Sequence, residues 1–112
     1  MKLRRWDVVF LRVDPNDATG HPAVVLSSEG ILGDAKLDRF NVVVGTKKQP
    51  AENAAAHHVI LNGADGLEFL TLVDCSLVFV ARKSAVIRSA GIVALNRRQE
   101  IQRKVRAFLG LG

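Results

Sequence analysis

The chain has 112 residues, 48% of them hydrophobic, and a formal net charge of +5, which supports one core-bearing domain over residues 1–112 and a surface that attracts anions. Apolar runs of only about five residues exclude a membrane-spanning helix and a secretory signal, and the single cysteine, Cys75, excludes an internal disulfide. We therefore predict a single-domain, soluble, cytoplasmic protein that does not associate with a membrane.

The first half of the chain predicts three strands joined by loops. Apolar side chains alternate over residues 6–13, and short branched runs cover residues 23–27 and 40–46. The run at 23–27 is typical of a strand that is buried on both faces. Turn-forming residues at 14–20 predict a loop, and the glycine-containing stretch 29–38 predicts a second loop with a helical turn near residues 35–37.

The second half predicts further short strands over residues 57–61, 67–74 and 77–81, and a seventh across residues 91–94. The residues 47–56 predict a surface loop. No stretch between the strands is long enough for a crossover helix, so a parallel α/β sheet is excluded. Many short strands joined by turns favour a mainly β protein, a β-rich α+β fold built as an antiparallel barrel or sandwich.

The C-terminal segment predicts the one long helix. Asn96 is placed to cap it, with Gln99 three residues later, and Gly110 is placed to end it. One face is apolar, formed by Ile101, Val105, Phe108 and Leu109. This face packs on the sheet or on a partner subunit.

Basic residues are concentrated at the ends of the chain and after the strand at 40–46. The groups are Lys2, Arg4 and Arg5; Lys47 and Lys48; and Arg97, Arg98, Arg103, Lys104 and Arg106. Such a surplus attracts phosphate backbones, acidic proteins or anionic lipids without choosing among them. A solvated helix face that aids solubility explains the last group equally well.

Four stretches together resemble the MazF/PemK family of toxins, the mRNA-cleaving halves of bacterial toxin–antitoxin pairs. Arg5-Trp6-Asp7-Val8-Val9 resembles the family's opening Arg-Gly-Asp-Val strand, and Leu72-Val73-Asp74-Cys75 resembles its Val-Asp-Gln strand. Val42-Val43-Val44-Gly45-Thr46 resembles the third strand, which ends in Thr or Ser. The most distinctive match is Gly20-His21-Pro22-Ala23-Val24-Val25-Leu26-Ser27, which resembles the family's second strand with its Arg-Pro-Ala start.

This resemblance implies a small SH3-like antiparallel barrel of about seven strands with a C-terminal helix, assembled as a homodimer. It implies a sequence-specific endoribonuclease that cleaves single-stranded RNA without metal or cofactor and leaves a 2′,3′-cyclic phosphate and a 5′-hydroxyl. It also implies an acidic antitoxin as partner. Gyrase-inhibiting CcdB toxins share the fold, so a CcdB-like gyrase inhibitor and a catalytically inactive barrel that binds nucleic acid or a partner stay as alternatives.

The resemblance places two catalytic positions in this chain. Thr46 matches the family's Thr or Ser, whereas His21 stands where the family has an arginine. A histidine can act as base or acid near neutral pH, but it lacks the permanent charge and the two-pronged donor geometry of arginine. Alternatively, His21 only ends a loop beside Pro22. The candidate RNA contacts are Arg4, Arg5, Lys47, Lys48, Arg97 and Arg98; Arg4 or Arg5 is also a candidate to replace the missing arginine.

A metal site is the remaining chemical hypothesis. His57 and His58 are adjacent, and neighbouring strand residues point to opposite faces, so the two rings are not expected to share one ion. No Cys-x-x-Cys or His-x-x-x-His spacing supports a site. We therefore predict no metal and no cofactor, and we interpret Cys75 as a small buried apolar residue.

Overall fold

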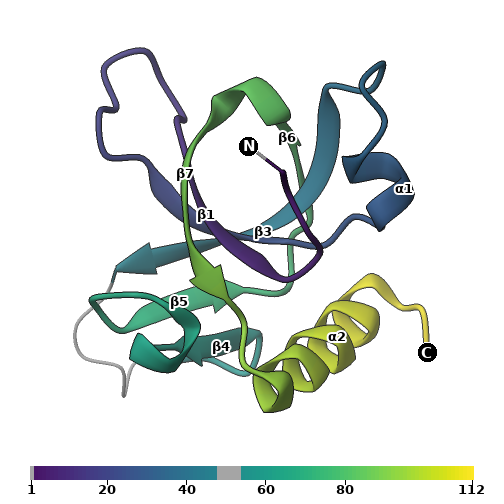
Figure 1. The fold of residues 1–112 in the computed structure, drawn as a ribbon. Helices are drawn as coiled ribbons and strands as arrows, with labels where there is room; N and C mark the ends of the chain where they lie inside the picture. The colour runs from purple at the N-terminus through teal and green to yellow at the C-terminus, as the bar shows by residue number, and fades with distance from the viewer. Residues whose placement is uncertain (1, 48–53) are drawn as a thin grey trace.

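The structure is a computed structural model that describes residues 2–47 and 54–112. Within these residues the chain forms seven antiparallel strands, two α-helices and two short 3-10 turns (Figure 1). The strands are β1 (Asp7–Leu11), β2 (His21–Val25), β3 (Arg39–Lys47), β4 (His58–Leu61), β5 (Thr71–Asp74), β6 (Phe79–Arg82) and β7 (Val86–Ile92). The helices are α1 (Glu29–Leu32) and α2 (Leu95–Leu109), and the 3-10 turns are η2 (Gly63–Asp65) and η3 (Lys83–Ala85).

The strands follow the order β4-β5-β3-β2-β1-β7, and β6 pairs with β3 outside this path. The predicted mainly β fold with about seven antiparallel strands and a C-terminal helix is confirmed. The ladders do not close into a ring, because β4 and β7 each pair with one strand only among the described residues. The sheet is therefore an open, strongly curved form of the expected barrel (Figure 1).

The longest strand, β3, connects two parts of the sheet. Its ladder with β2 ends where Val44 faces Ala23, and from Gly45 onward it pairs with β5 instead. A Cβ added at Gly45 would lie 2.6 Å from Thr71 Cγ2, so the absence of a side chain lets β5 approach here. The end of β3 thus diverges from the start of β2.

The core occupies both faces of the central strands. Val24 of β2 packs in one cluster with Val43, whereas its neighbours Ala23 and Val25 belong to a second cluster. All three β2 residues are buried, which confirms the prediction of a strand buried on both faces. Apolar side chains at all three positions allow this, since alternate residues of a strand face opposite sides.

Helix α2 packs against β4 on the lower side of the sheet in Figure 1. Ile101 is fully buried and Val105 packs against the same cluster, while Phe108 and Leu109 remain about half exposed. The predicted cap at Asn96 is wrong: the N-cap is Ala94, and no side chain of the helix itself caps it. Instead, the amide of Ala94 donates to Asp65 Oδ1 at 2.7 Å, so the capping carboxylate comes from η2.

Other predicted boundaries also change. The short helix α1 lies at Glu29–Leu32 rather than at residues 35–37, and β7 begins at Val86 rather than at residue 91. Sequence periodicity misses β7 because its register on β1 contains two irregularities, which break the alternation. Trp6 precedes β1 with a φ of 75°, the left-handed region that favours glycine, and it matches the glycine of the family's opening motif.

No helix among the described residues is long and apolar enough to cross a membrane.

Candidate functional site

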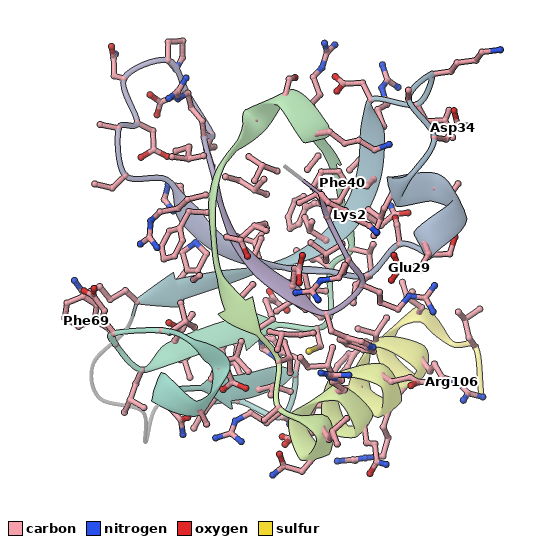
Figure 2. All side chains as sticks on the ribbon, in the orientation of Figure 1. Lys2, Glu29, Asp34, Phe40, Phe69 and Arg106 are labelled. Atoms are coloured by element: carbon pink, nitrogen blue, oxygen red, sulfur yellow. The ribbon has the colours of Figure 1, made fainter. Side chains whose placement is uncertain are left out.

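A cavity of about 570 Å³ opens where β2 begins and β3 ends. Its walls come from β1, β7, the loop that leads into β2, the last residue of β3 and the segment that links η2 to β5. The polar and charged side chains of this wall include His21, Lys47, Glu68, Thr71 and Arg88. Figure 2 shows Phe69, another lining residue, at the edge of the molecule beside the end of β3.

The loop before β2 holds His21 at this cavity. Gly20 has a φ of 79°, and a Cβ there would lie 2.9 Å from both Ile87 Cδ1 and Leu11 O, so only glycine lets the loop pass this close to β1 and β7. Pro22 follows and favours an extended conformation at His21. The sequence Gly-His-Pro therefore sets the imidazole at the entrance of the strand, where the side chain is 51% exposed.

Asp17 orients the ring of His21. The carboxylate Oδ2 lies 3.5 Å from His21 Nε2, and Oδ1 accepts a hydrogen bond from the Gly20 amide at 2.9 Å. Because Asp17 is tied to the loop backbone, it holds Nε2 on its own side and leaves Nδ1 for other partners. The sequence marks Asp17 only as a turn residue; its position four residues before a histidine was the signal available.

Two cations line the cavity, and each lies over a phenylalanine ring. Lys47 Nζ lies 3.4 Å from the ring centre of Phe69, and Arg88 Cζ lies 4.1 Å from that of Phe10. Among the described residues that line the cavity, Glu68 is the only carboxylate, so this part of the wall has a formal charge of +1 with His21 neutral and +2 with it protonated (two cations, one anion, one imidazole). Such a wall favours an anionic ligand.

Arg88 is the site residue that sequence reasoning misses. It lies in β7, directly opposite Phe10 of β1, and Phe10 in turn lies opposite Pro22 of β2. This row across three strands joins Arg88 to the His21 end of β2. No sequence pattern predicts a role for Arg88. Strand β7 is not recognised from its pattern, and the contact of Arg88 with Phe10 joins residues that are far apart in the chain.

Thr46 directly precedes Lys47 in β3, but it is not among the residues that line the cavity. Lys47 and Thr71 face each other across β3 and β5 and both line it, so by strand alternation Thr46 points to the other face. The ladder of β2 on β3 ends at the Ala23–Val44 pair, and Thr46 pairs with Leu72 of β5, so no strand pairing joins Thr46 to His21. Its catalytic role stays a prediction.

The N-terminal arginines lie at the opposite end of β2 from His21. Arg5 Nε donates to the carbonyl oxygens of Leu26 and Ser27 at 2.9 and 3.2 Å, and Arg4 Nε lies 3.6 Å from Asp7 Oδ1. Neither arginine lines the cavity, so neither replaces the guanidinium there in this structure. Whether they contact RNA elsewhere stays a prediction.

The first arginines of α2 connect the helix to the sheet. Arg97 Nε lies 3.1 Å from Asp65 Oδ2 and donates to Ile60 O at 3.2 Å, while Arg98 Nε donates to Val93 O at 2.6 Å. These contacts give both side chains a structural role, and their part in RNA binding stays a prediction. Lys48, the remaining predicted RNA contact, lies outside the described residues.

The two adjacent histidines do not point to opposite faces. Residue His57 lies in the turn before β4, where strand alternation does not apply, and its ring centre is 4.2 Å from that of His58. His57 Nε2 lies 3.9 Å from Asp74 Oδ1. Over residues 2–47 and 54–112, no group of three or more histidine, cysteine or acidic side chains is arranged to hold a metal ion.

Two side chains at the end of β5 have shifted pKa values. Burial alone would raise the pKa of Asp74, but hydrogen bonds from Ser76 and the nearby charges of His57 and His58 outweigh it and lower the pKa below 3.8. Burial raises the pKa of the Cys75 thiol to about 12. Both residues lie away from the cavity, at the α2 side of the sheet, where Cys75 belongs to the cluster that contains Ile101.

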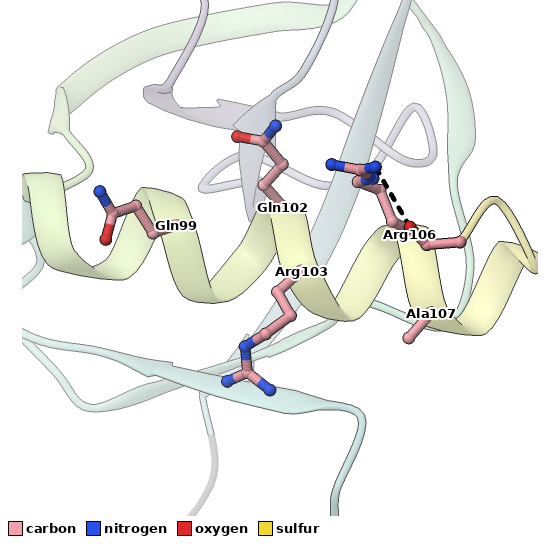
Figure 3. A pocket seen from close by; sticks show the side chains of 6 residues that line it. Gln99, Gln102, Arg103, Arg106 and Ala107 are labelled. Carbon is pink, nitrogen blue, oxygen red and sulfur yellow. Dashed lines mark hydrogen bonds between the residues drawn. The ribbon is translucent and has the colours of Figure 1, made fainter.

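A second hollow of about 410 Å³ lies along α2 (Figure 3). Its lining includes Gln99, Gln102, Arg103 and Arg106, and Arg106 Nη2 donates to Gly112 O at 3.1 Å. These side chains offer hydrogen bonds and positive charge, but none of the described lining residues has an imidazole or a carboxylate side chain. The cavity at His21 brings acid–base groups together with cations, so it is the better candidate for chemistry.

Comparison with known proteins identifies the family of the chain. Residues 4–109 match the sequence profile of the PemK-like, MazF-like toxin of type II toxin–antitoxin systems. The chain belongs to this family. No curated protein matches it by sequence.

Solved structures share the fold at low sequence identity. A MazE–MazF complex from Deinococcus radiodurans superposes with a TM-score of 0.77 at 16% identity, covering 100% of both chains. An endoribonuclease from a mycobacterial species, solved with its cognate antitoxin, gives a TM-score of 0.76 at 15% identity over 97% of this chain and 94% of that one. The toxin MazF-mt6 of Mycobacterium tuberculosis gives 0.75 at 14% identity, over 93% of this chain and 96% of that one.

Proposed function

We propose that this PemK-like, MazF-like chain is an endoribonuclease toxin that cleaves single-stranded mRNA at specific sequences, with its active site at the His21 cavity. The observation that carries the proposal is the cavity itself. It joins a histidine held by a carboxylate to two cations on a wall of net positive charge. Family membership supports the same activity, and the fold is shared with a mycobacterial endoribonuclease.

The proposed step is an internal transesterification of RNA. The ribose 2′ oxygen forms a bond to the adjacent phosphorus while the bond from phosphorus to the 5′ oxygen breaks. The 2′ proton passes to a base, and the departing 5′ oxygen takes up a proton, so no other reactant is needed. The products are a 2′,3′-cyclic phosphate and a 5′-hydroxyl. The step requires an acid–base group and positive donors around the phosphorane.

His21 is proposed as the acid–base group. With Nε2 held by Asp17, the Nδ1 lone pair of the neutral ring is the acceptor for the 2′ proton. Lys47 supplies positive charge from the cavity wall. Thr46, the position that matches the family's Thr or Ser, is proposed to donate its hydroxyl to a phosphate oxygen from outside the cavity wall. Lys48, Arg4, Arg5, Arg97 and Arg98 stay candidates for contacts to the RNA outside the cavity.

The proposed partners are a cognate acidic antitoxin and a second copy of the chain. Of the three similar structures described above, one is an endoribonuclease in complex with its cognate antitoxin and one is a MazE–MazF complex. A net charge of +5 and a positive cavity wall favour an acidic segment that occupies the RNA site. Bound there, the antitoxin would compete directly with RNA.

The test is incubation of the purified chain in EDTA with a long single-stranded RNA. We expect discrete fragments from the wild type and a loss of cleavage of about 10²-fold or more in His21→Ala, the usual contribution of general acid–base catalysis. Thr46→Ala tests the second position. His57→Ala is the matched control, since it removes a partly exposed histidine away from the cavity.

Intact RNA at high protein concentration would contradict the proposal. Inhibition of DNA supercoiling by gyrase in the same preparation would then select the gyrase-inhibitor alternative. RNA binding without cleavage or gyrase inhibition would instead indicate an inactive binding protein.

A further inference from the structure

We propose that Arg88 is a phosphate-binding residue of this active site and provides its permanent guanidinium charge. The inference rests on the proposed function and adds to it a residue that no sequence motif of the chain contains. The chemistry creates the need: a phosphorane carries extra negative charge, and His21 carries a positive charge only when protonated. Among the lining residues that the structure describes, Arg88 is the only arginine.

The sheet sets Arg88 in place. Antiparallel pairing aligns Arg88 of β7 with Phe10 of β1, and Phe10 with Pro22, the residue after His21. Phe10 lies beneath the guanidinium, with Cζ 4.1 Å from the ring centre. A planar cation resting on an aromatic face retains its edge N–H groups for an anion, and this contact limits the motion of the long side chain.

The charge of Arg88 is available to a ligand. Within the described residues, no carboxylate lies within ion-pair distance of its guanidinium, and its side chain is exposed. By contrast, Arg97 is engaged by the buried Asp65. An exposed arginine that is oriented by a ring and faces a cavity beside a histidine has the donor geometry that phosphate recognition uses.

Lys47 completes the arrangement from β3, at the end of the cavity wall formed by the β3–β5 pair. Its ammonium also rests on a ring, that of Phe69. The two cations belong to different parts of the sheet, so an RNA phosphate at His21 is approached by Arg88 from the β1–β7 side and by Lys47 from the β3–β5 side. Arg88 contributes paired N–H donors, whereas Lys47 contributes a point charge.

The experiment compares Arg88→Ala and Arg88→Lys with Arg82→Ala. Arg82 is an exposed arginine of β6 that does not line the cavity, so it is a matched control. The cleaved sequence is first mapped on long RNA, and kcat and KM are then measured in EDTA on an oligonucleotide of that sequence. Binding is measured over a range of salt concentrations with the all-deoxy version, which lacks the attacking 2′-OH and stays intact.

We expect Arg88→Ala to lower kcat/KM by about 10²-fold to 10³-fold, as loss of a donor to the transition state does. The slope of log affinity against log salt should fall by about 0.7, the value for one phosphate contact on a single strand. Arg88→Lys should keep the slope and recover only part of the cleavage. Arg82→Ala should leave both unchanged, and all variants should unfold at the wild-type temperature within a few degrees.

The outcomes separate the two proposals. Wild-type cleavage that is lost in His21→Ala but unchanged in Arg88→Ala overturns the role of Arg88 and leaves the proposed function intact. If the wild type binds the deoxy strand but cuts no RNA, the proposed function fails. In that case an unchanged salt slope in Arg88→Ala overturns the phosphate contact as well, whereas a smaller slope supports it.

Discussion

Arg97 and Arg88 lie in two regions of the molecule that differ in whether a carboxylate neutralises the arginine. At the junction of α2 with the sheet, Arg97 pairs with Asp65, whose side chain is 0% exposed. At the cavity, Arg88 lies on the ring of Phe10 with its charge open to solvent. A buried carboxylate must keep its partners because an unpaired buried charge is costly, whereas an exposed cation can exchange water for a ligand at little cost.

This contrast distinguishes stabilising from functional charge within one small protein. Substitutions at the junction should lower the free energy of unfolding and leave the cleavage activity of the folded protein unchanged. Substitutions at the cavity should lower the cleavage activity and leave the free energy of unfolding nearly unchanged.

The largest effect is expected from Asp65→Ala. The carboxylate accepts from the amides of Asn62 and Ala94 at 2.9 and 2.7 Å and pairs with Arg97. Its removal leaves the two amides without this acceptor and Arg97 without its carboxylate. The free energy of unfolding should fall by about 3–5 kcal/mol, measured by urea denaturation. Glu68→Ala, which removes an exposed carboxylate of the cavity, should change it by less than about 0.5 kcal/mol. Equal effects of the two would remove the distinction between the regions.

Gly66→Ala is expected to have the next largest effect, because Gly66 joins the junction to the cavity. Its φ is 90°, and an added Cβ would lie 2.4 Å from the carbonyl oxygen of Ala90 in β7. Strain of this kind costs about 1–3 kcal/mol, again by urea denaturation. Gly63→Ala is the control in the same turn, since a Cβ there meets no atom within 4 Å. A neutral Gly66→Ala would mean that the turn can move away from β7.

Labelling of Cys75 measures opening of the junction directly. The thiol is 0% exposed, and burial raises its pKa to about 12, so the reactive thiolate is scarce at mildly alkaline pH. Alkylation of the native protein should be about 100-fold or more slower than in urea. Asp65→Ala should raise the rate of Cys75 alkylation in the native protein, and Arg88→Ala should leave this rate unchanged. Rapid labelling of the native wild type would show that the helix separates readily from the sheet.

The smallest effect is expected from Ser76→Ala, which should change how the free energy of unfolding depends on pH. Since hydrogen bonds from Ser76 help to lower the pKa of Asp74 below 3.8, the ionised carboxylate stabilises the folded state above that pH, and the contribution is lost as pH falls through the lowered folded value. Ser76→Ala removes the hydroxyl donor at 2.5 Å and should reduce stability at neutral pH. The difference from wild type should shrink well below pH 3.8, as urea denaturation at the two pH values would reveal. A difference independent of pH would assign the effect to packing.

Much of the fold could be predicted because its signals are local. The buried runs at β2 and β3, the polar turns and the amphipathic pattern of α2 each depend on neighbouring residues. Strand β7 and the cap of α2 could not be predicted from the sequence. Strand β7 depends on its pairing with β1, and the cap depends on Asp65 from another turn. The orientation of His57 relative to His58 also depended on where β4 begins.

The candidate site divides in the same way. Gly20, His21 and Pro22 could be found in the sequence, because adjacent residues specify how the chain enters a strand. The carboxylate of Asp17 was visible only as part of a turn. Arg88 could not be found from the sequence. Two of the arginines that composition favoured make structural contacts, Arg97 with Asp65 and Arg5 with the backbone that follows β2, and their part in RNA binding stays a prediction.

The sequence by itself determined the mainly β class, the buried central strands, the amphipathic C-terminal helix and the family motif around His21. Only the tertiary structure decided which of its many basic side chains face one cavity and which hold the helix to the sheet. The physical reason is that periodicity and turn chemistry are read along the chain, whereas the fate of a charge depends on the dielectric and the partners that folding brings beside it. Two arginines that look alike in the sequence therefore differ entirely in the folded protein.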